Sequence, residues 1–299
     1  MKPLQQEQPI KLGKPKWLKR KLPTGPEYEE IRKLLKNGCL TTVCQEAQCP
    51  NQFECFSKGT ATFMILGEKC TRNCRFCAVG NGPDGPPDDT EPLRVAQAIK
   101  KMKLKYAVIT SVTRDDLEDG GASFFISTLN EIRSQSPGTL IEILIPDLQG
   151  NWAALRRIAA ARPDVLNHNI ETVARLYSEV RPQAIYARSL ELLAEVKKSY
   201  PRMVTKSGIM VGLGETLEEL ETAMDDLLQV DCDILTLGQY LQPSRHHLPV
   251  HEFVTPQMFA DLQDIALRKG FAGVASGPSV RSSYEAGVLY KKALENQSS

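Results

Sequence analysis

Cysteine is the residue type whose distribution in this chain most directly indicates chemistry. Six of the eight cysteines lie between residues 44 and 77, whereas Cys232 stands alone far downstream. Cysteines that only fill a core would be scattered, and disulfides are rare in a reducing compartment. Clustered cysteines in such a compartment therefore indicate ligation of a metal or an iron–sulfur cluster.

The second half of this group is a C-x3-C-x2-C run formed by Cys70, Cys74 and Cys77. Three thiolates at this spacing can bind three irons of a cubane [4Fe-4S] cluster, which leaves one iron open for another ligand. A zinc site is the alternative, but it typically shows two C-x2-C pairs or a Cys/His set. None of the four histidines lies near this run, which favours the iron–sulfur cluster.

The composition of the 299 residues excludes several other classes of protein. Hydrophobic residues make up 41% of the chain, and 37 Lys and Arg against 36 Asp and Glu give a net charge of +1. This balance argues against a protein that coats DNA, and no apolar run is long enough to span a membrane. The first residues lack the apolar centre of a secretory signal. We therefore expect a cytoplasmic enzyme with no nucleic-acid or membrane partner.

From residue 60 onward, apolar runs typical of buried parallel strands alternate with amphipathic helical segments. Expected strands cover 61–66, 106–112, 140–146, 164–170, 203–211 and 233–240, and the main expected helices cover 95–102, 122–133, 152–161, 189–198, 217–228 and 256–268. This α/β pattern predicts a partial (β/α)6 TIM-type barrel. Chemistry in such barrels lies at the carboxyl ends of the strands, and Cys70 follows the first expected strand.

Polar residues also follow the fourth expected strand. Asn167, His168, Asn169 and Glu171 cluster there, where polar side chains line sites more often than they fill cores. Arg188 begins a helix and could pair with a carboxylate of a cofactor in bidentate geometry, or form an ordinary surface salt bridge.

Two further groups have simpler interpretations. The segment 212–215, Gly-Leu-Gly-Glu, is no dinucleotide fingerprint, because Leu217 occupies the third glycine position. It predicts either a tight turn or a close approach of the backbone to a cofactor. His246, His247 and His251 have no nearby carboxylate or cysteine in the sequence, so we do not expect a metal site there.

An aromatic residue, Phe76, precedes the last cysteine of the C-x3-C-x2-C run. In this form the run resembles the signature of the radical S-adenosylmethionine superfamily. The resemblance implies that the open iron binds the amino and carboxylate groups of S-adenosylmethionine. It also implies that one electron from the cluster cleaves the sulfonium and yields a 5′-deoxyadenosyl radical, with Phe76 packed near the adenine.

A second cysteine triplet makes the resemblance more specific. Cys44, Cys49 and Cys55 form a C-x4-C-x5-C run, and the two runs together look like the lipoyl synthase family. Further matches cover roughly residues 14–290: Lys-Pro-x-Trp-Leu at 14–18, Glu-Ala-x-Cys-Pro-Asn at 46–51, Thr-Ser-Val-Thr-Arg-Asp-Asp-Leu at 110–117, Asn-His-Asn-x-Glu-Thr at 167–172, Lys-Ser-Gly-x-Met-Val-Gly-Leu-Gly-Glu at 206–215 and Arg-Ser-Ser-Tyr at 281–284.

The family resemblance implies two [4Fe-4S] clusters and S-adenosylmethionine as cofactors. The implied ligands of the first cluster are Cys70, Cys74 and Cys77, and those of an auxiliary cluster are Cys44, Cys49, Cys55 and Ser283. The implied S-adenosylmethionine contacts are Phe76, Ser111, Asn169, Glu171 and Arg188. Ser282 is the alternative serine ligand, and Cys39 lies at a further x4 spacing, so an all-cysteine auxiliary cluster stays open. Glu285 follows the Arg-Ser-Ser-Tyr motif, at a position where we expect a more basic residue.

The implied reaction inserts sulfur at carbons 6 and 8 of an octanoyl chain on a lysine of a lipoyl-carrier protein, with the auxiliary cluster consumed as the sulfur source. Implied partners are the octanoylated glycine-cleavage H protein, the E2 lipoyl domains of 2-oxoacid dehydrogenases, and ferredoxin or flavodoxin as electron donor. The expected organisation is an extension (1–58), the barrel (59–276) and a tail (277–299).

Two other functions remain open from the sequence. Another radical S-adenosylmethionine enzyme that inserts sulfur, biotin-synthase-like or tRNA-methylthiolating, would lack the double triplet and the Arg-Ser-Ser-Tyr motif. An electron-transfer or iron-sensing protein with two clusters would gain nothing from an open iron, and its cluster signal would not respond to S-adenosylmethionine.

Overall fold

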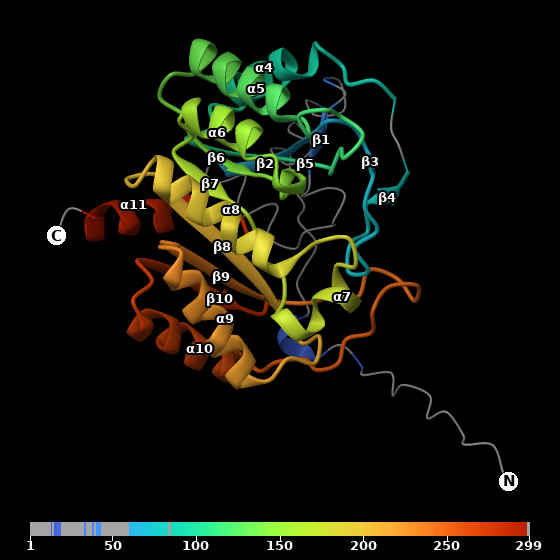
Figure 1. Cartoon of the computed structure of the whole chain (residues 1–299), viewed down its shortest axis with the longest axis vertical. Helices are drawn as coiled ribbons and strands as arrows, with labels where there is room; N and C mark the ends of the chain where they lie inside the picture. Colours follow the sequence, from blue (N-terminus) through green and yellow to red (C-terminus); the bar gives the residue numbers. More distant parts are fainter. Residues whose placement is uncertain are drawn as a thin grey trace, which may run out of the picture.

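One curved sheet runs through the computed structural model, which describes residues 13, 15–18, 33, 38, 40–42, 60–82 and 85–297 (Figure 1). Its strands are neighbours in chain order, β1-β2-β5-β6-β7-β8-β9-β10, and all pairs are parallel except β1 with β2. These strands are β1 (Thr41–Thr42), β2 (Thr60–Ile65), β5 (Tyr106–Ser111), β6 (Leu140–Leu144), β7 (Val165–Asn167), β8 (Val204–Val211), β9 (Ile234–Gln239) and β10 (Gly273–Gly277). A separate small pair joins β3 (Lys69–Cys70) to β4 (Gly80–Asn81).

Helices in the connections between the parallel strands cover one face of the sheet (Figure 1). They are α4 (Glu91–Met102), α5 (Ala122–Gln135), α6 (Trp152–Ala160), α8 (Tyr186–Ser199), α9 (Leu217–Gln229) and α10 (Pro256–Lys269). α9 begins with a capping box, because Thr216 Oγ1 accepts from the Glu219 amide and the Glu219 carboxylate accepts from the Thr216 amide. Short helices complete the connections: η1 (Lys16–Leu18), η2 (Leu148–Gly150), η3 (Ala174–Leu176) and α7 (Tyr177–Val180).

The two faces of the sheet have different cores. Phe63 of β2 and Ile109 of β5 belong to the large cluster that also contains Ile99 of α4. Because side chains alternate along a strand, Tyr106 and Val108 of β5 lie on the opposite face. The C-terminal helix α11 (Ala286–Gln297) packs against that second face and closes the ends at which the strands begin.

The second face also holds a fully buried ion pair. Lys206 Nζ lies 3.0 and 3.1 Å from the two carboxylate oxygens of Glu142, which also accept from Asn167 Nδ2 at 2.8 Å and from the Tyr106 hydroxyl at 2.9 Å. A buried charge is tolerated only when it is paired and hydrogen-bonded. This arrangement meets that condition, since Glu142 of β6 has partners from the three strands β5, β7 and β8.

The α/β class and the partial barrel are confirmed, and each of the six predicted strands is present. β10 and α11 extend the structure beyond the prediction. β7 ends at Asn167, earlier than predicted, and Glu171 soon adopts a left-handed backbone with φ of 66°. The division of the chain at residues 58 and 276 stays a prediction.

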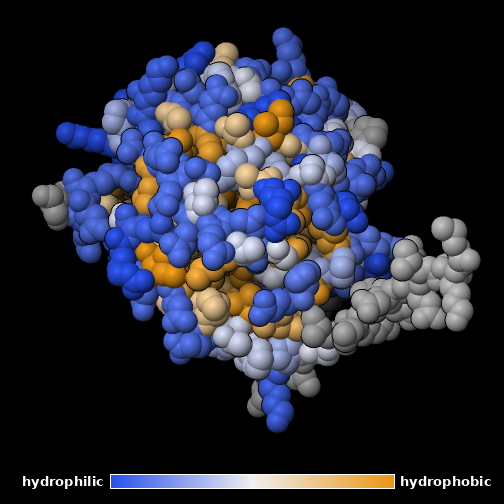
Figure 2. All heavy atoms as spheres, turned by 60° about the horizontal axis from the view of Figure 1, so that its bottom comes forward, coloured by the Kyte–Doolittle hydropathy of each residue, from blue (hydrophilic) through white to orange (hydrophobic). Residues whose placement is uncertain are grey.

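On the side turned forward in Figure 2, apolar surface shows between hydrophilic side chains. Large apolar side chains that are exposed include Ile185, Val288 and Leu267. No helix within the described residues is both long and apolar enough to cross a membrane.

The buried pair predicts a stability difference. Lys206→Met leaves the Glu142 carboxylate buried without its cation, so the free energy of unfolding in urea should fall by about 3–5 kcal/mol. Lys198→Met is the control, since the Lys198 side chain is 79% exposed. The double variant Glu142→Leu/Lys206→Met should recover much of the loss, and a Lys206→Met protein as stable as the control would contradict the interpretation.

Candidate active site at the carboxyl ends of the strands

The C-x3-C-x2-C run lies in the connection after β2, at the carboxyl ends of the strands, as predicted. The Gly82 amide donates to the Cys70 carbonyl at 3.0 Å, and this bond together with the β3–β4 pair closes the run into a loop. Within the loop, the Cys77 amide donates to the Cys74 carbonyl at 3.0 Å. All three thiols are partly buried and form no disulfide, and Cys70 Sγ accepts from the Arg72 amide at 3.4 Å.

The chemistry of these donors fits a cubane cluster. Within the described ranges, no three His, Cys, Asp or Glu side chains meet around a point where a single metal ion could bind. A cubane does not require such a point, because each thiolate binds a different iron. Burial raises the pKa of Cys77 to about 11 and also raises the pKa of Cys74, which Arg181 partly offsets. The ligating thiolates therefore depend on nearby positive charge.

Arg72, between the first two cysteines of the run, ties the loop to two other strand ends. Its Nε lies 2.6 Å from Asp115 Oδ2, and its Nη2 lies 3.0 Å from Asp115 Oδ1 and 2.6 Å from Asp147 Oδ1. Asp115 follows β5 and Asp147 follows β6. Burial opposes both charges, but the pairing outweighs it: the pKa of Arg72 is raised, and that of Asp147 is lowered to about 2. No local pattern in the sequence links these three residues, so this group was not predicted.

A second segment, formed by the end of α7 and the residues just after it, holds the backbone on both sides of Cys74. The Asn73 amide donates to Gln183 Oε1 at 2.6 Å, and the Arg75 amide donates to the Val180 carbonyl at 3.0 Å. These bonds fix the middle cysteine of the run from both sides.

A third segment, which follows β9, holds the end of the run. The Leu248 amide donates to the Arg75 carbonyl at 3.1 Å, and His247 Nε2 lies 2.9 Å from the Cys77 carbonyl. Since a carbonyl can only accept, Nε2 donates and Nδ1 accepts from Ser244 Oγ at 2.9 Å. The sequence led us to expect no metal site at His247, and its contact with the cysteine loop was not predicted. The one signal in the sequence was that His247 follows the sixth predicted strand, at the end of the sheet where the site is expected.

Several buried polar atoms have no hydrogen-bond partner among the described residues. They are Ser111 Oγ, Asn167 Oδ1, Asn169 Oδ1, Thr172 Oγ1 and Arg181 Nε. Buried polar atoms normally have partners. Ser111 ends β5 and Asn169 follows β7, so both lie at the end of the sheet that carries the cysteine loop. These atoms fit a polar cofactor bound there.

Asn169 and Glu171 lie together beside a glycine. Asn169 Nδ2 donates to Glu171 Oε1 at 3.1 Å, and the Glu171 amide donates to the Gly208 carbonyl at 2.9 Å. A Cβ on Gly208 would lie 2.9 Å from Asn169 Oδ1, so glycine leaves necessary space there. Burial raises the pKa of Glu171.

The other two predicted cofactor contacts have protein partners. Arg188, in the first turn of α8, places Nη1 3.4 Å from Asp147 Oδ2 and so joins the Arg72 group. Phe76 packs against the large core, which anchors the cysteine loop. Contact of either residue with a cofactor stays a prediction.

The tight turn predicted at 212–215 is present, and His168 has a structural role. The Glu215 carboxylate accepts from the Gly212 amide at 2.5 Å and from the Leu213 amide at 2.9 Å, which forms a tight turn. His168 is buried between the Ile145 carbonyl at 2.8 Å and Ser189 Oγ at 3.0 Å. Burial lowers the pKa of His168 to about 4, so it is a neutral structural residue.

The segment that contains Ser283 lies against the carboxyl half of β9. A Cβ on Gly238 would lie 2.3 Å from the Val280 carbonyl oxygen, so only glycine permits this approach. Ser283 is partly buried in the turn between β10 and α11. Ser282 is its partly buried neighbour. The proposed auxiliary-cluster ligands Cys44, Cys49 and Cys55, and the alternative Cys39, lie outside the described residues.

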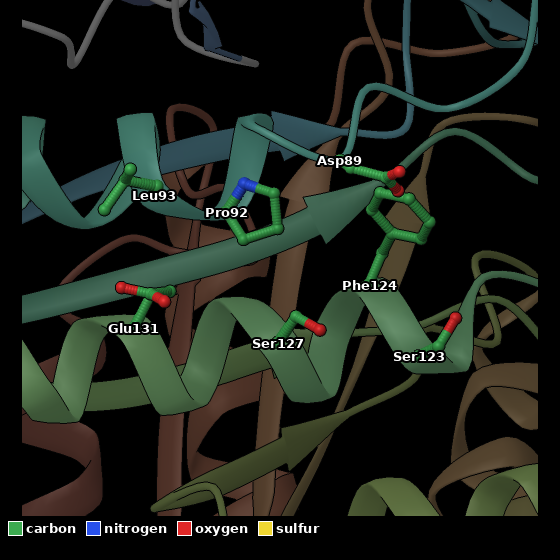
Figure 3. A pocket seen from close by; sticks show the side chains of 7 residues that line it. All are labelled: Asp89, Pro92, Leu93, Ser123, Phe124, Ser127 and Glu131. Carbon is green, nitrogen blue, oxygen red and sulfur yellow. The ribbon is translucent and has the colours of Figure 1, made fainter.

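Two pockets lie away from this chemistry. The one in Figure 3, of about 310 Å³, lies between α4 and α5 and is lined by Asp89, Pro92, Leu93, Ser123, Phe124, Ser127 and Glu131. A pocket of about 670 Å³ shares Asp89, Ser123 and Phe124 with it. Neither is lined by a predicted site residue.

Comparison with known proteins agrees with this geometry. Residues 64–227 match the model of the radical SAM superfamily, and residues 2–49 match the N-terminal domain of lipoyl synthase of the radical SAM family. A curated protein of Desulfotalea psychrophila named lipoyl synthase is 65% identical over 289 residues, which are 97% of each chain. The chain belongs to the lipoyl synthase family.

Other relatives support membership of the lipoyl synthase family and its fold. A lipoyl synthase of Caldanaerobacter subterraneus is 54% identical over 275 residues, 92% of this chain and 96% of that protein. Methylornithine synthase shares the fold with a TM-score of 0.56 at 15% identity, over 89% of this chain and 79% of that one. Streptococcus suis SuiB bound to S-adenosylmethionine gives 0.54 at 12% identity, over 69% of this chain and 45% of that one.

The pairing of Asp147 with Arg72 predicts a pH dependence of stability. Because the pKa of Asp147 falls from 3.8 to about 2 on folding, its ionised form stabilises the fold above pH 4 by about 2 kcal/mol, and this contribution is lost as the pH falls toward 2. Asp147→Asn should therefore lower the free energy of unfolding at pH 7, and the difference from wild type should shrink below pH 4.

Asp225→Asn is the matched control for this measurement. The Asp225 carboxylate also contacts a cation, Lys269 Nζ at 2.7 Å, but it is 52% exposed, so its loss should change stability little at either pH. An Asp147→Asn variant whose destabilisation does not depend on pH would show that the paired charge is not what stabilises the loop.

Proposed function

We propose that this chain inserts two sulfur atoms at carbons 6 and 8 of an octanoyl chain that is amide-linked to a lysine of a lipoyl-carrier protein. The carrying observation is a three-cysteine loop fixed at the carboxyl ends of the strands by Arg72, in a member of the lipoyl synthase family. Aliphatic C–H bonds have no acidic proton, so a positioned base could not activate them. When bound, a [4Fe-4S] cluster and S-adenosylmethionine supply the one-electron chemistry that this substrate needs.

The chain would supply two sets of ligands. Cys70, Cys74 and Cys77 would bind the cluster that activates S-adenosylmethionine, with the loop backbone held from three sides. The proposed ligands of the auxiliary cluster, which is consumed as the sulfur source, are Cys44, Cys49, Cys55 and Ser283. The place of the Ser283 segment beside the carboxyl half of β9 supports this assignment, because the cysteine loop lies at the same end of the sheet.

The chain would bind S-adenosylmethionine through side chains at the strand ends. The proposed contacts are Phe76, Ser111, Asn169, Glu171 and Arg188. Ser111 Oγ and Asn169 Oδ1 have no partner among the described residues, which supports a role in accepting or donating hydrogen bonds to the cofactor. The Arg188 guanidinium shares Asp147 with Arg72 and keeps donors for a cofactor carboxylate.

The substrates are lipoyl-carrier proteins. The octanoylated glycine-cleavage H protein and the E2 lipoyl domains of 2-oxoacid dehydrogenases are the proposed carriers, and ferredoxin or flavodoxin the proposed electron donor. A cytoplasmic location fits cysteines that must stay reduced to bind iron. The proposed organisation remains an extension (1–58), a barrel (59–276) and a tail (277–299).

Mass spectrometry of an octanoyl-lysine peptide tests the proposed reaction. After anaerobic incubation with the reconstituted protein, S-adenosylmethionine and dithionite, the peptide should carry two sulfurs, and a one-sulfur species should be seen at early times. Cys74→Ala should abolish both products and the formation of 5′-deoxyadenosine. Cys232→Ala is the control, because Cys232 is buried away from the loop and should leave both reactions in place. An unchanged peptide beside abundant 5′-deoxyadenosine would point to another substrate.

The assignment of the serine ligand makes a separate prediction. An alkoxide is a harder donor than a thiolate, and its loss would let one iron leave the auxiliary cluster. Ser283→Cys should therefore give protein with full iron and sulfide content that transfers sulfur poorly to the octanoyl peptide. Ser282→Cys is the matched control and should transfer sulfur normally. Unimpaired transfer by Ser283→Cys would refute the role of this serine.

A further inference from the structure

A buried cation to which the proposed function gives no role lies beside Cys74. The amides on either side of Cys74 bond to Gln183 and Val180, as described above, and Arg181 lies between these two residues. The segment that fixes the middle cysteine therefore also carries the guanidinium of Arg181.

Three contacts hold the Arg181 side chain in this buried place. Nη1 donates to the Asn169 carbonyl at 2.9 Å, to the Ile170 carbonyl at 3.3 Å and to the Tyr177 hydroxyl at 2.9 Å. The guanidinium carbon also lies 5.3 Å from the centroid of the Tyr177 ring. Only 8% of the residue is exposed, so the charge is fixed in position and poorly screened by water.

The bonds of Arg181 go to neutral groups rather than to a carboxylate. Its Nε is buried without a hydrogen-bond partner in the described part of the chain. Among the described acidic side chains, Glu171 acts on it most, but burial raises the pKa of Glu171 and so favours its neutral form. Among the described residues, the guanidinium is therefore a buried positive charge without a carboxylate hydrogen-bond partner, on the segment whose Val180 and Gln183 bond to the backbone on both sides of Cys74.

We infer that Arg181 is a positioning residue that raises the reduction potential of the cluster bound by Cys70, Cys74 and Cys77. The inference rests on the proposed cluster. One-electron reduction by an external donor adds one negative charge to the cluster and its thiolates, and a fixed cation at Cys74 stabilises that charge. Arg181 would thus make the cluster easier to reduce without touching the substrate.

A redox titration of the reconstituted protein without S-adenosylmethionine, followed by electron paramagnetic resonance, tests this role. Arg181→Gln should lower the equilibrium constant for one-electron reduction at least tenfold, which is a midpoint about 59 mV more negative. The signal of this cluster is identified as the one retained when Cys44, Cys49 and Cys55 are replaced by Ala. If Arg181→Gln does not fold, Arg181→Met replaces it in the same titration, because an apolar side chain needs no polar partner at this buried position.

Two matched variants separate charge from structure. Arg181→Lys keeps the charge and should stay closer to the wild-type potential. Arg175→Gln removes a cation that is 55% exposed and paired with Glu219, and should change nothing. The inference fails if Arg181→Gln has the wild-type potential, if the Lys and Gln variants shift equally, or if only the affinity for S-adenosylmethionine falls. A wild-type protein that assembles no cluster on Cys70, Cys74 and Cys77 would instead refute the proposed function.

Discussion

The buried contacts of Arg72 with Asp115 and Asp147 are the interaction on which the rest of the site depends. A loop that carries three cysteines has little regular structure of its own, since β3 and β4 contribute only two residues each. The two carboxylates come from the connections after β5 and β6, so the loop is tied to strand ends rather than to its sequence neighbours. Removal of any one of these three side chains would leave buried charge uncompensated, so the three are needed together.

The sheet that supports this loop has two different faces, one that packs against the helices and one that carries small and polar residues. The face under the helices is apolar and includes Phe63 and Ile109, which stabilise the fold by burial. The other face carries small and polar residues, including Gly208 and Gly238, where a larger side chain would collide with Asn169 or with the Val280 carbonyl. Space and hydrogen-bonding groups at the strand ends are therefore built into the strands themselves.

Much of this architecture could be predicted from the sequence, because its signals are local. The alternation of apolar runs with helical segments located the six strands and the main helices, α9 among them. The spacing of Cys70, Cys74 and Cys77 identified the loop that carries the chemistry. β10 was not predicted, because the strand Gly-Val-Ala-Ser-Gly is short and rich in small residues.

The partners of the cysteine loop could not be predicted, because they come from distant connections. Arg72 lies 75 positions from Asp147, and His247 lies 170 positions from Cys77. Only the register of the parallel strands brings such residues together. Arg181 was likewise hidden, since an arginine after a short helix is usually a surface residue, and its burial depends on Tyr177 and on the carbonyls after β7.

In the proposed function, two cysteine triplets hold two clusters with separate tasks, so an experiment that separates the two reactions is the decisive one. Protein in which Cys44, Cys49 and Cys55 are replaced by Ala should still cleave S-adenosylmethionine to 5′-deoxyadenosine but insert no sulfur into an octanoyl-lysine peptide. Protein in which Cys70, Cys74 and Cys77 are replaced should do neither. Sulfur insertion by the first variant, or formation of 5′-deoxyadenosine by the second, would contradict the account.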